Sequence, residues 1–144
     1  MPHRLINTLI QNQQVISIGM TSTVTEAARM MKESKIGAIM VVVDGKLAGI
    51  FTERDALFRV LAQKRNPHTT QLSEVMTRDP ETVAPNKPFG HALHIMYEGG
   101  FRHVPVVEDG VPIGMVSSRD VLGPELEEFA CELQRRERIT EILG

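Results

Sequence analysis

An internal duplication is the feature that most constrains how this chain can fold. Shifting the sequence against itself by 65 positions aligns residues 15–57 with residues 80–122 without a gap. The match is densest where IGAIMVVVDGKLAGIFTERDAL (36–57) lies over FRHVPVVEDGVPIGMVSSRDVL (101–122). This period is too long for a solenoid repeat of the usual kind. We therefore expect two similar units related by a pseudo-two-fold axis.

Each copy contains a predicted β-hairpin. Apolar runs at 38–43 and 104–107, rich in β-branched residues, end in Asp-Gly pairs at 44–45 and 109–110. A second apolar run follows each pair. Asp-Gly between two such runs is the strongest short-range hairpin signal in a sequence. Before each hairpin, apolar residues recur at helical spacing and predict an amphipathic helix packed on the sheet.

The expected fold class follows from this order of elements, which is strand, helix, strand, hairpin, strand, helix in each copy. A Thr or Ser after each hairpin starts a further helix, expected over 53–64 and from Ser118. We predict a mixed α/β (α+β) fold of two repeats, each a small three-stranded sheet with two packed helices. The expected segments are an N-terminal helix and lead-in (1–14), the first repeat (15–64), a linker (65–74), the second repeat (75–123) and a C-terminal helix (124–144).

Composition limits the classes of partner. Sixteen Lys and Arg against eighteen Asp and Glu give a net charge of -2, so no basic field favours nucleic acid. The single cysteine, Cys131, excludes an internal disulfide and a multi-cysteine zinc cluster. The longest apolar runs are too short to cross a bilayer. We expect a cytoplasmic protein that requires no metal and binds no membrane or nucleic acid.

Two matching heptapeptides, at 49–55 and 114–120, lie where a strand ends and a helix begins. Thr52 with Asp55, and Ser117 with Asp120, have the spacing of a capping box, in which hydroxyl and carboxylate satisfy free backbone N–H groups. In that interpretation the motifs are structural and the protein is a scaffold.

The same residues are also suited to a nucleotide. A helix N-terminus and a hydroxyl offer donors to a phosphate, and Arg54 or Arg119 adds a planar cationic group. The aspartate that follows is an acceptor suited to ribose hydroxyls. Capping explains neither the repeated arginine nor the repeated glycine at the strand end, so the repetition favours ligand binding.

The duplicated motif resembles that of a tandem cystathionine-beta-synthase (CBS) domain pair, or Bateman module, over about residues 15–122. This resemblance implies a non-catalytic, regulatory homodimer that binds adenosine-containing ligands (AMP, ADP, ATP, S-adenosylmethionine or dinucleotides) and signals to a partner protein. It also implies that the motif hydroxyl contacts phosphate, that the aspartate contacts ribose, and that adenine lies between apolar strand residues.

In such pairs the motif of one repeat faces the strand start of the other, which gives two candidate sites. The resemblance places one set around the second motif, with Ile36, Gly37, Ala38, Met115, Ser117, Arg119 and Asp120. It places the other set around the first motif, with Ile50, Thr52, Arg54, Asp55, Phe101, Arg102 and His103. The two sites are not expected to be equal, because Gly37 and Ala38 leave room for a base where Arg102 and His103 add bulk and positive charge.

An enzyme acting on a nucleotide is the alternative from another class. In it, Asp55 or Asp120 would act as a base. The sequence has no phosphate-binding P-loop, no HExxH and no acid–base pair that spacing supports. We therefore predict no catalytic residues and no required cofactor.

Overall fold

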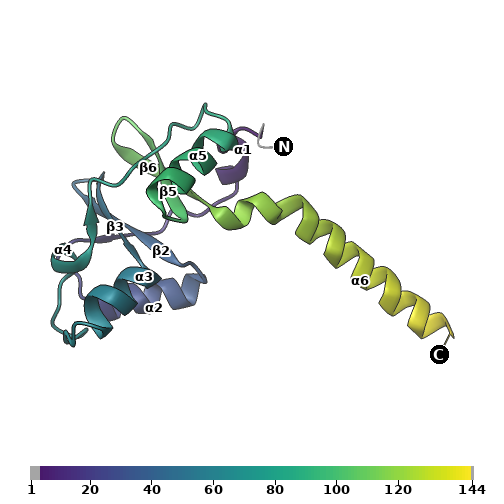
Figure 1. The fold of residues 1–144 in the computed structure, drawn as a ribbon, viewed down its shortest axis with the longest axis horizontal. Helices are drawn as coiled ribbons and strands as arrows, with labels where there is room; N and C mark the ends of the chain where they lie inside the picture. The colour runs from purple at the N-terminus through teal and green to yellow at the C-terminus, as the bar shows by residue number, and fades with distance from the viewer. Residues whose placement is uncertain (1–3, 144) are drawn as a thin grey trace.

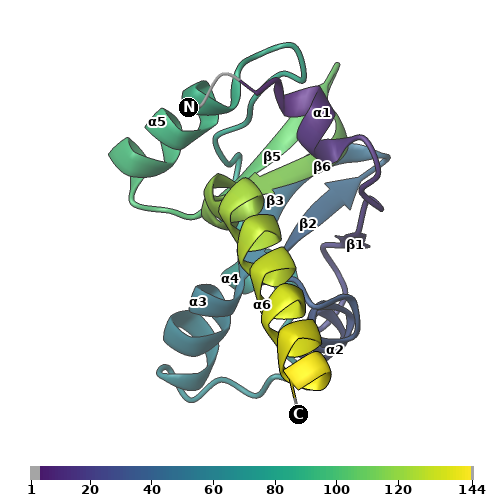
Figure 2. The same ribbon diagram turned by 90° about the vertical axis from the view of Figure 1, so that its right-hand side faces the viewer.

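The computed structural model describes residues 4–143, without the side chains of 124–127 and 143. The two repeats lie against each other, and a long C-terminal helix, α6 (Gly123–Leu143), projects from them (Figure 1). Helices of the second repeat lie at one end of the body and helices of the first at the other, with the strands between them (Figure 2). The mixed fold of two small αβ repeats expected from the sequence is confirmed.

The first repeat is built on a four-stranded sheet, β1 (Ser17–Gly19), β2 (Ala38–Val43), β3 (Lys46–Thr52) and β4 (Thr77–Arg78), in that order. Strand β1 pairs parallel to β2, and α2 (Val24–Ser34) connects them. The predicted β2–β3 hairpin is present. Asp44 and Gly45 both have positive φ, as a type I′ turn requires.

The second repeat has a two-stranded sheet, β5 (His103–Glu108) and β6 (Val111–Ser117), preceded by α5 (Phe89–Gly99). Its turn, at Asp109 and Gly110, has the same positive φ values as the first. In place of a full first strand, Val83 makes a single parallel bridge to Val106. The strand counts of four and two thus differ from the expected three and three.

Exchange of edge segments between the repeats explains part of this difference. The predicted linker ends within α4 (Leu72–Val75), which leads into β4, and β4 pairs with β3 of the first repeat. The segment 65 positions earlier, which includes α1 (Ile6–Ile10), packs on β6 of the second repeat. There it contributes no strand.

Glycine allows the close approach of these edge segments. A Cβ on Gly49 would lie 2.8 Å from the carbonyl oxygen of Thr77, and one on Gly114 would lie 2.8 Å from Cβ of Ile10. Real side chains do not tolerate such distances. The repeated glycine of the motif therefore has a packing role on each sheet, in addition to any role in ligand binding.

The helices after the hairpins are irregular. In the first repeat, α3 (Glu53–Asp55) continues as the π-helical turn η1 (Ala56–Leu61), so the helix ends short of the predicted residue 64. In the second repeat the 3-10 helix η2 (Ser118–Leu122) leads directly into α6. A C-terminal helix is therefore present, and it begins at Gly123, one residue before the predicted segment 124–144.

Each repeat has its own hydrophobic core. The first core lies between the four-stranded sheet and α2, with Phe51 fully buried, and the second lies between α5, α1 and the β5–β6 hairpin, with Phe89 buried. The apolar stripes predicted for α2 and α5 face these cores, since Ala27, Met31 and Met96 are buried. Among the described residues, no helix is long and apolar enough to cross a membrane.

Candidate ligand-binding site

The first motif forms a complete helix cap. The backbone N–H of Asp55 donates to Oγ1 of Thr52 at 3.1 Å, and the N–H of Thr52 donates to Oδ2 of Asp55 at 3.0 Å. The other carboxylate oxygen of Asp55 lies 3.4 Å from Nε of Arg59. Asp55 is only 8% exposed, so both of its oxygens are committed to the protein itself.

The second motif repeats the cap in a more open setting. The N–H of Ser117 donates to Oδ2 of Asp120 at 2.8 Å. Asp120 is half-buried, in contrast to buried Asp55. Its carbonyl oxygen accepts from the guanidinium of Arg4 at 2.7 Å, which ties this turn to the N-terminal segment. The capping interpretation therefore describes real hydrogen bonds at both motifs, and what distinguishes the motifs is their surroundings.

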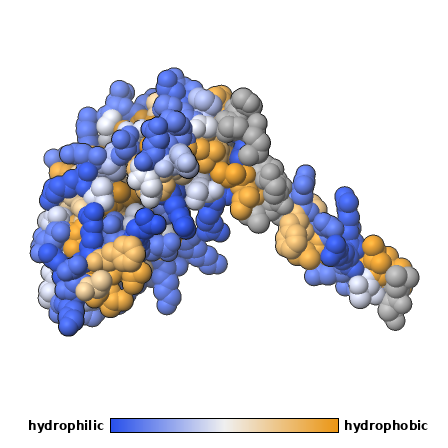
Figure 3. All heavy atoms as spheres, in the orientation of Figure 1, coloured by the Kyte–Doolittle hydropathy of each residue, from blue (hydrophilic) through white to orange (hydrophobic). Residues whose placement is uncertain are grey.

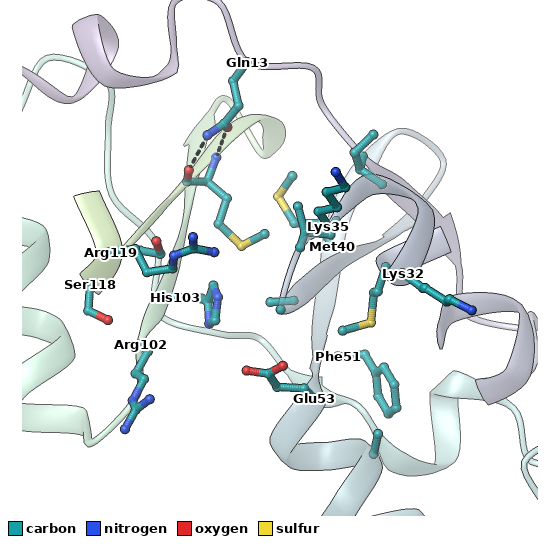
Figure 4. Close-up of a pocket in the computed structure, with 18 of the residues that line it drawn as sticks. Gln13, Lys32, Lys35, Met40, Phe51, Glu53, Arg102, His103, Ser118 and Arg119 are labelled. Atoms are coloured by element: carbon teal, nitrogen blue, oxygen red, sulfur yellow. Dashed lines mark hydrogen bonds between the residues drawn. The ribbon is translucent and has the colours of Figure 1, made fainter. Parts of the chain in front are cut away.

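A cavity of about 640 Å³ opens beside the second motif, between the two repeats (Figure 4). Its size falls within the range of small-molecule sites. Nine of the predicted site residues line it: Ile36, Gly37, Ala38, Arg102, His103, Met115, Ser117, Arg119 and Asp120. The structure thus brings the second motif together with the small residues at the start of β2.

The other five predicted residues do not line this cavity. Thr52 and Asp55 form the cap described above, and the guanidinium of Arg54 donates to the carbonyl of Gly100 at 3.3 Å. The ring of Phe101 packs over Gly99, and Ile50 is buried. Arg102 and His103, assigned from the sequence to the first motif, lie instead in the cavity of the second.

Gly37 lines the cavity and leaves space there because it has no side chain. A Cβ at this position would lie 3.2 Å from Oε1 of Glu53, so that side chain would have to shift, and it would contact the ring of His103 at 3.4 Å. The carbonyl of Gly37 accepts from the N–H of Glu53 at 3.0 Å. The equivalent bond in the second repeat joins Ser118 N–H to the Arg102 carbonyl, also at 3.0 Å.

Several lining residues were not predicted from the sequence. Gln13 is one: its side-chain amide donates to the carbonyl of Met115 at 2.8 Å and accepts from its N–H at 2.7 Å, as a neighbouring strand would (Figure 4). Lys32, Lys35, Glu53 and Phe51 are others. Gln13, Lys32 and Lys35 lie outside the two heptapeptides. The 65-residue offset is the one sequence signal that could have drawn attention to the N-terminal segment, which contains Gln13.

Burial lowers the pKa of His103 below its usual 6.5. The carboxylates of Glu53 and Asp120 act in the opposite direction, and the Arg102 guanidinium adds to the lowering. The ring is therefore neutral at pH 7. A cavity with a neutral imidazole can accept or donate a hydrogen bond at that position, and the ring becomes a cation only in more acidic solution.

Lowering the pH is expected to destabilise the protein through His103. Because its pKa is lower in the folded than in the unfolded chain, the unfolded chain binds more protons as the pH falls through 6.5, and folding stability is lost. Urea denaturation at pH 7.5 and 5.5 measures this. The loss between these pH values should be smaller in His103→Gln than in wild type. Equal losses would mean that His103 does not carry this effect.

The fold and the paired motifs define a class of tandem-repeat αβ module, and comparison with known proteins identifies the family. The sequence profile of the CBS domain matches residues 9–62 and 72–124. The chain therefore belongs to the CBS domain family, as a tandem pair, as the motif resemblance indicated.

Relatives of known sequence share this architecture. The chain is 38% identical over 118 residues to the CBS domain-containing protein CBSX3, mitochondrial, of Arabidopsis thaliana, covering 78% of this chain and 57% of that protein. It is 35% identical over 108 residues to the CBS domain-containing protein YhcV of Bacillus subtilis, covering 75% and 76%. The chain spans only 19% of another Arabidopsis relative, CBSCBSPB1. Some relatives are thus much longer proteins.

Solved structures of CBS pairs superpose on this chain. One is the CBS domain pair of protein MJ0100 in complex with 5′-methylthioadenosine and S-adenosyl-L-methionine. It matches with a TM-score of 0.77 and 27% identity, over 88% of this chain and 99% of that one.

Proposed function

We propose that this CBS pair is a non-catalytic regulatory module that binds one adenosine-containing ligand in the cavity between its repeats. The observation that carries the proposal is the cavity itself, in which Ser117, Arg119 and Asp120 of the second repeat face Gly37 and Ala38 of the first. A phosphate-binding hydroxyl and arginine, a ribose-binding carboxylate and an open strand start are thereby combined in one space.

The remaining lining suits a purine base. Ile36 of the first repeat and Met115 of the second are half-buried apolar residues of this lining, with Ala38 and Met40 buried behind its surface. A base between such side chains loses its contact with water on both faces, while its ribose and phosphate stay near the polar motif. The related MJ0100 pair, which binds adenosine derivatives, supports this choice of ligand class.

We assign the first motif a structural role. Asp55 is buried and engaged by Thr52 and Arg59, and Arg54 is engaged by Gly100. Displacing those bonds for a ribose would leave buried groups without partners, which is unfavourable. The proposal therefore predicts one ligand for each chain, at the second motif.

We further propose that the protein acts as a homodimer. Leu57, Phe58 and Leu61 on the helix after β3 are exposed, as are Phe129 and Ile139 on projecting α6. Figure 3 shows apolar surface both on α6 and low on the body of the protein. Apolar surface of this kind favours association. Ligand binding would then alter the response of a partner protein only if it favours one arrangement of the assembly over another.

A ligand-free scaffold is the second candidate, because the capping hydrogen bonds at both motifs are present without any ligand. A thermal-shift panel of 5′-methylthioadenosine, S-adenosylmethionine, AMP and ATP distinguishes the two. At a ligand concentration 100 times the Kd, binding to the folded state adds about 2.7 kcal/mol of stability. A raised melting temperature with at least one of these ligands is expected. No shift with any of them would favour the scaffold.

A cytoplasmic location stays a prediction. One relative is named as mitochondrial, so membership of the family does not fix the compartment.

A further inference from the structure

The cavity has a basic wall in the first repeat that the second repeat does not reproduce. Lys32 and Lys35, at the C-terminal end of α2, both line the cavity. The residues 65 positions later, at the end of α5, are Tyr97 and Gly100. The two lysines are therefore a property of the open site and not a general property of the repeat.

Lys35 has a backbone conformation that glycine favours. With φ 56° and ψ 45° it closes α2 in the left-handed region, and its N–H donates to carbonyls of the last turn. Gly100 closes α5 in the same way, with φ 72°. A residue with a Cβ adopts this conformation at a cost that glycine avoids. A lysine at this position therefore places a cationic side chain in the lining of the cavity, at a backbone cost that glycine would avoid.

Arginines of the second repeat add positive charge to the same cavity. Figure 4 shows Arg119 on the wall opposite Lys35, and Arg102 is also in the lining. Lys32 also belongs to the lining, but in Figure 4 the ends of Lys32 and Arg102 point away from the space between the two walls, which leaves Lys35 and Arg119 as the cations on either side of it. Among the side chains that the structure describes, none of the four cations takes part in a salt bridge.

We propose that Lys35, opposite Arg119, makes this cavity selective for adenosine ligands with two or three phosphates. The inference rests on the adenosine site proposed above and names the ligand within that class. Each added phosphate brings negative charge to a cavity in which Lys35 and Arg119 make no salt bridge with a described carboxylate. AMP brings less negative charge than ADP or ATP. 5′-Methylthioadenosine is uncharged, and S-adenosylmethionine carries a positive sulfonium.

Calorimetric titration with ATP, AMP and 5′-methylthioadenosine tests the selectivity. Wild type should bind ATP at least about tenfold more tightly than AMP, a ratio that one or two favourable charge contacts can produce. In Lys35→Gly the ratio should fall to about threefold or less, with AMP affinity changed less than about twofold. The melting temperature of this variant should equal or exceed that of wild type, because glycine suits the left-handed backbone.

Lys64→Gly is the matched control. Lys64 has the same φ of 56° and does not line the cavity. Its replacement should leave the ATP-to-AMP ratio unchanged.

Two results would overturn the selectivity while leaving the adenosine site intact. They are equal affinities for ATP and AMP in wild type, and an ATP-to-AMP ratio that Lys35→Gly leaves unaltered. Binding of none of the three probes would overturn the selectivity, and a further absence of binding by S-adenosylmethionine would overturn the proposed function as well.

Discussion

Asp120→Ala is expected to weaken binding of the adenosine ligand by about ten- to a hundredfold. Its carboxylate faces the cavity and is the acceptor proposed for the ribose hydroxyls. Hydrogen bonds to a charged group contribute about 1.5–3 kcal/mol, which corresponds to that range of affinity. Calorimetric titration of wild type and variant with the same ligand measures the change.

Asp55→Ala is the matched control, since both aspartates cap a helix at the same position of the repeat. Asp55 does not line the cavity, so affinity should stay within about twofold of wild type. Stability should fall by about 1–3 kcal/mol, because removing the buried carboxylate leaves the Thr52 N–H without its acceptor. Equal losses of affinity in the two variants would contradict the assignment of one open site.

Phe89→Ala is expected to lower the free energy of unfolding by about 3–5 kcal/mol, the usual cost of emptying a buried phenylalanine site. Phe89 is 1% exposed at the start of α5 and belongs to the second core. Urea denaturation measures the change. Phe89→Leu fills more of the space than Phe89→Ala and should therefore lower the free energy of unfolding by less. It also provides a measurable variant if Phe89→Ala prevents folding.

Tyr97→Ala tests the opposite face of the same helix. Tyr97 is 89% exposed, so its removal should change stability by no more than about 0.5 kcal/mol. If Phe89→Ala lowered the free energy of unfolding no more than Tyr97→Ala does, Phe89 would not belong to the core of the second repeat.

Local signals explain why much of the fold could be predicted from sequence. The Asp-Gly pairs fix both hairpins, because their residues adopt the positive φ that a two-residue turn needs. The stripes of α2 and α5 followed from helical spacing of apolar residues that the structure buries. These features depend only on neighbours in the chain.

Contacts between distant segments could not be predicted in this way. The pairing of β4 with β3 depends on Met76 and Thr77 meeting Gly49, and the packing of α1 on β6 depends on Ile10 meeting Gly114. The strand counts of four and two result from these tertiary contacts. The π-helical turn after Asp55, which shortens the predicted helix, likewise has no signal that we recognise in the sequence.

The site was only partly visible in the sequence for the same reason. The motifs indicated which side chains could bind a nucleotide, and the small residues at 37 and 38 indicated that the two sites would differ. The family resemblance placed Arg102 and His103 in the other site, but His103 pairs with Ser117 across the β5–β6 hairpin and so lies beside the second motif. The bond of Gln13 to Met115 had no signal in the sequence, because it depends on how the N-terminal segment packs on the second repeat.

The stoichiometry of ligand binding tests the central claim most directly. Calorimetric titration of the wild-type protein with ATP, AMP, 5′-methylthioadenosine and S-adenosylmethionine should give saturable binding of at least one of them, at one molecule for each chain. Two molecules for each chain would show that the first motif also binds ligand and would contradict the single open site. No binding of any of the four would contradict the assignment of an adenosine ligand.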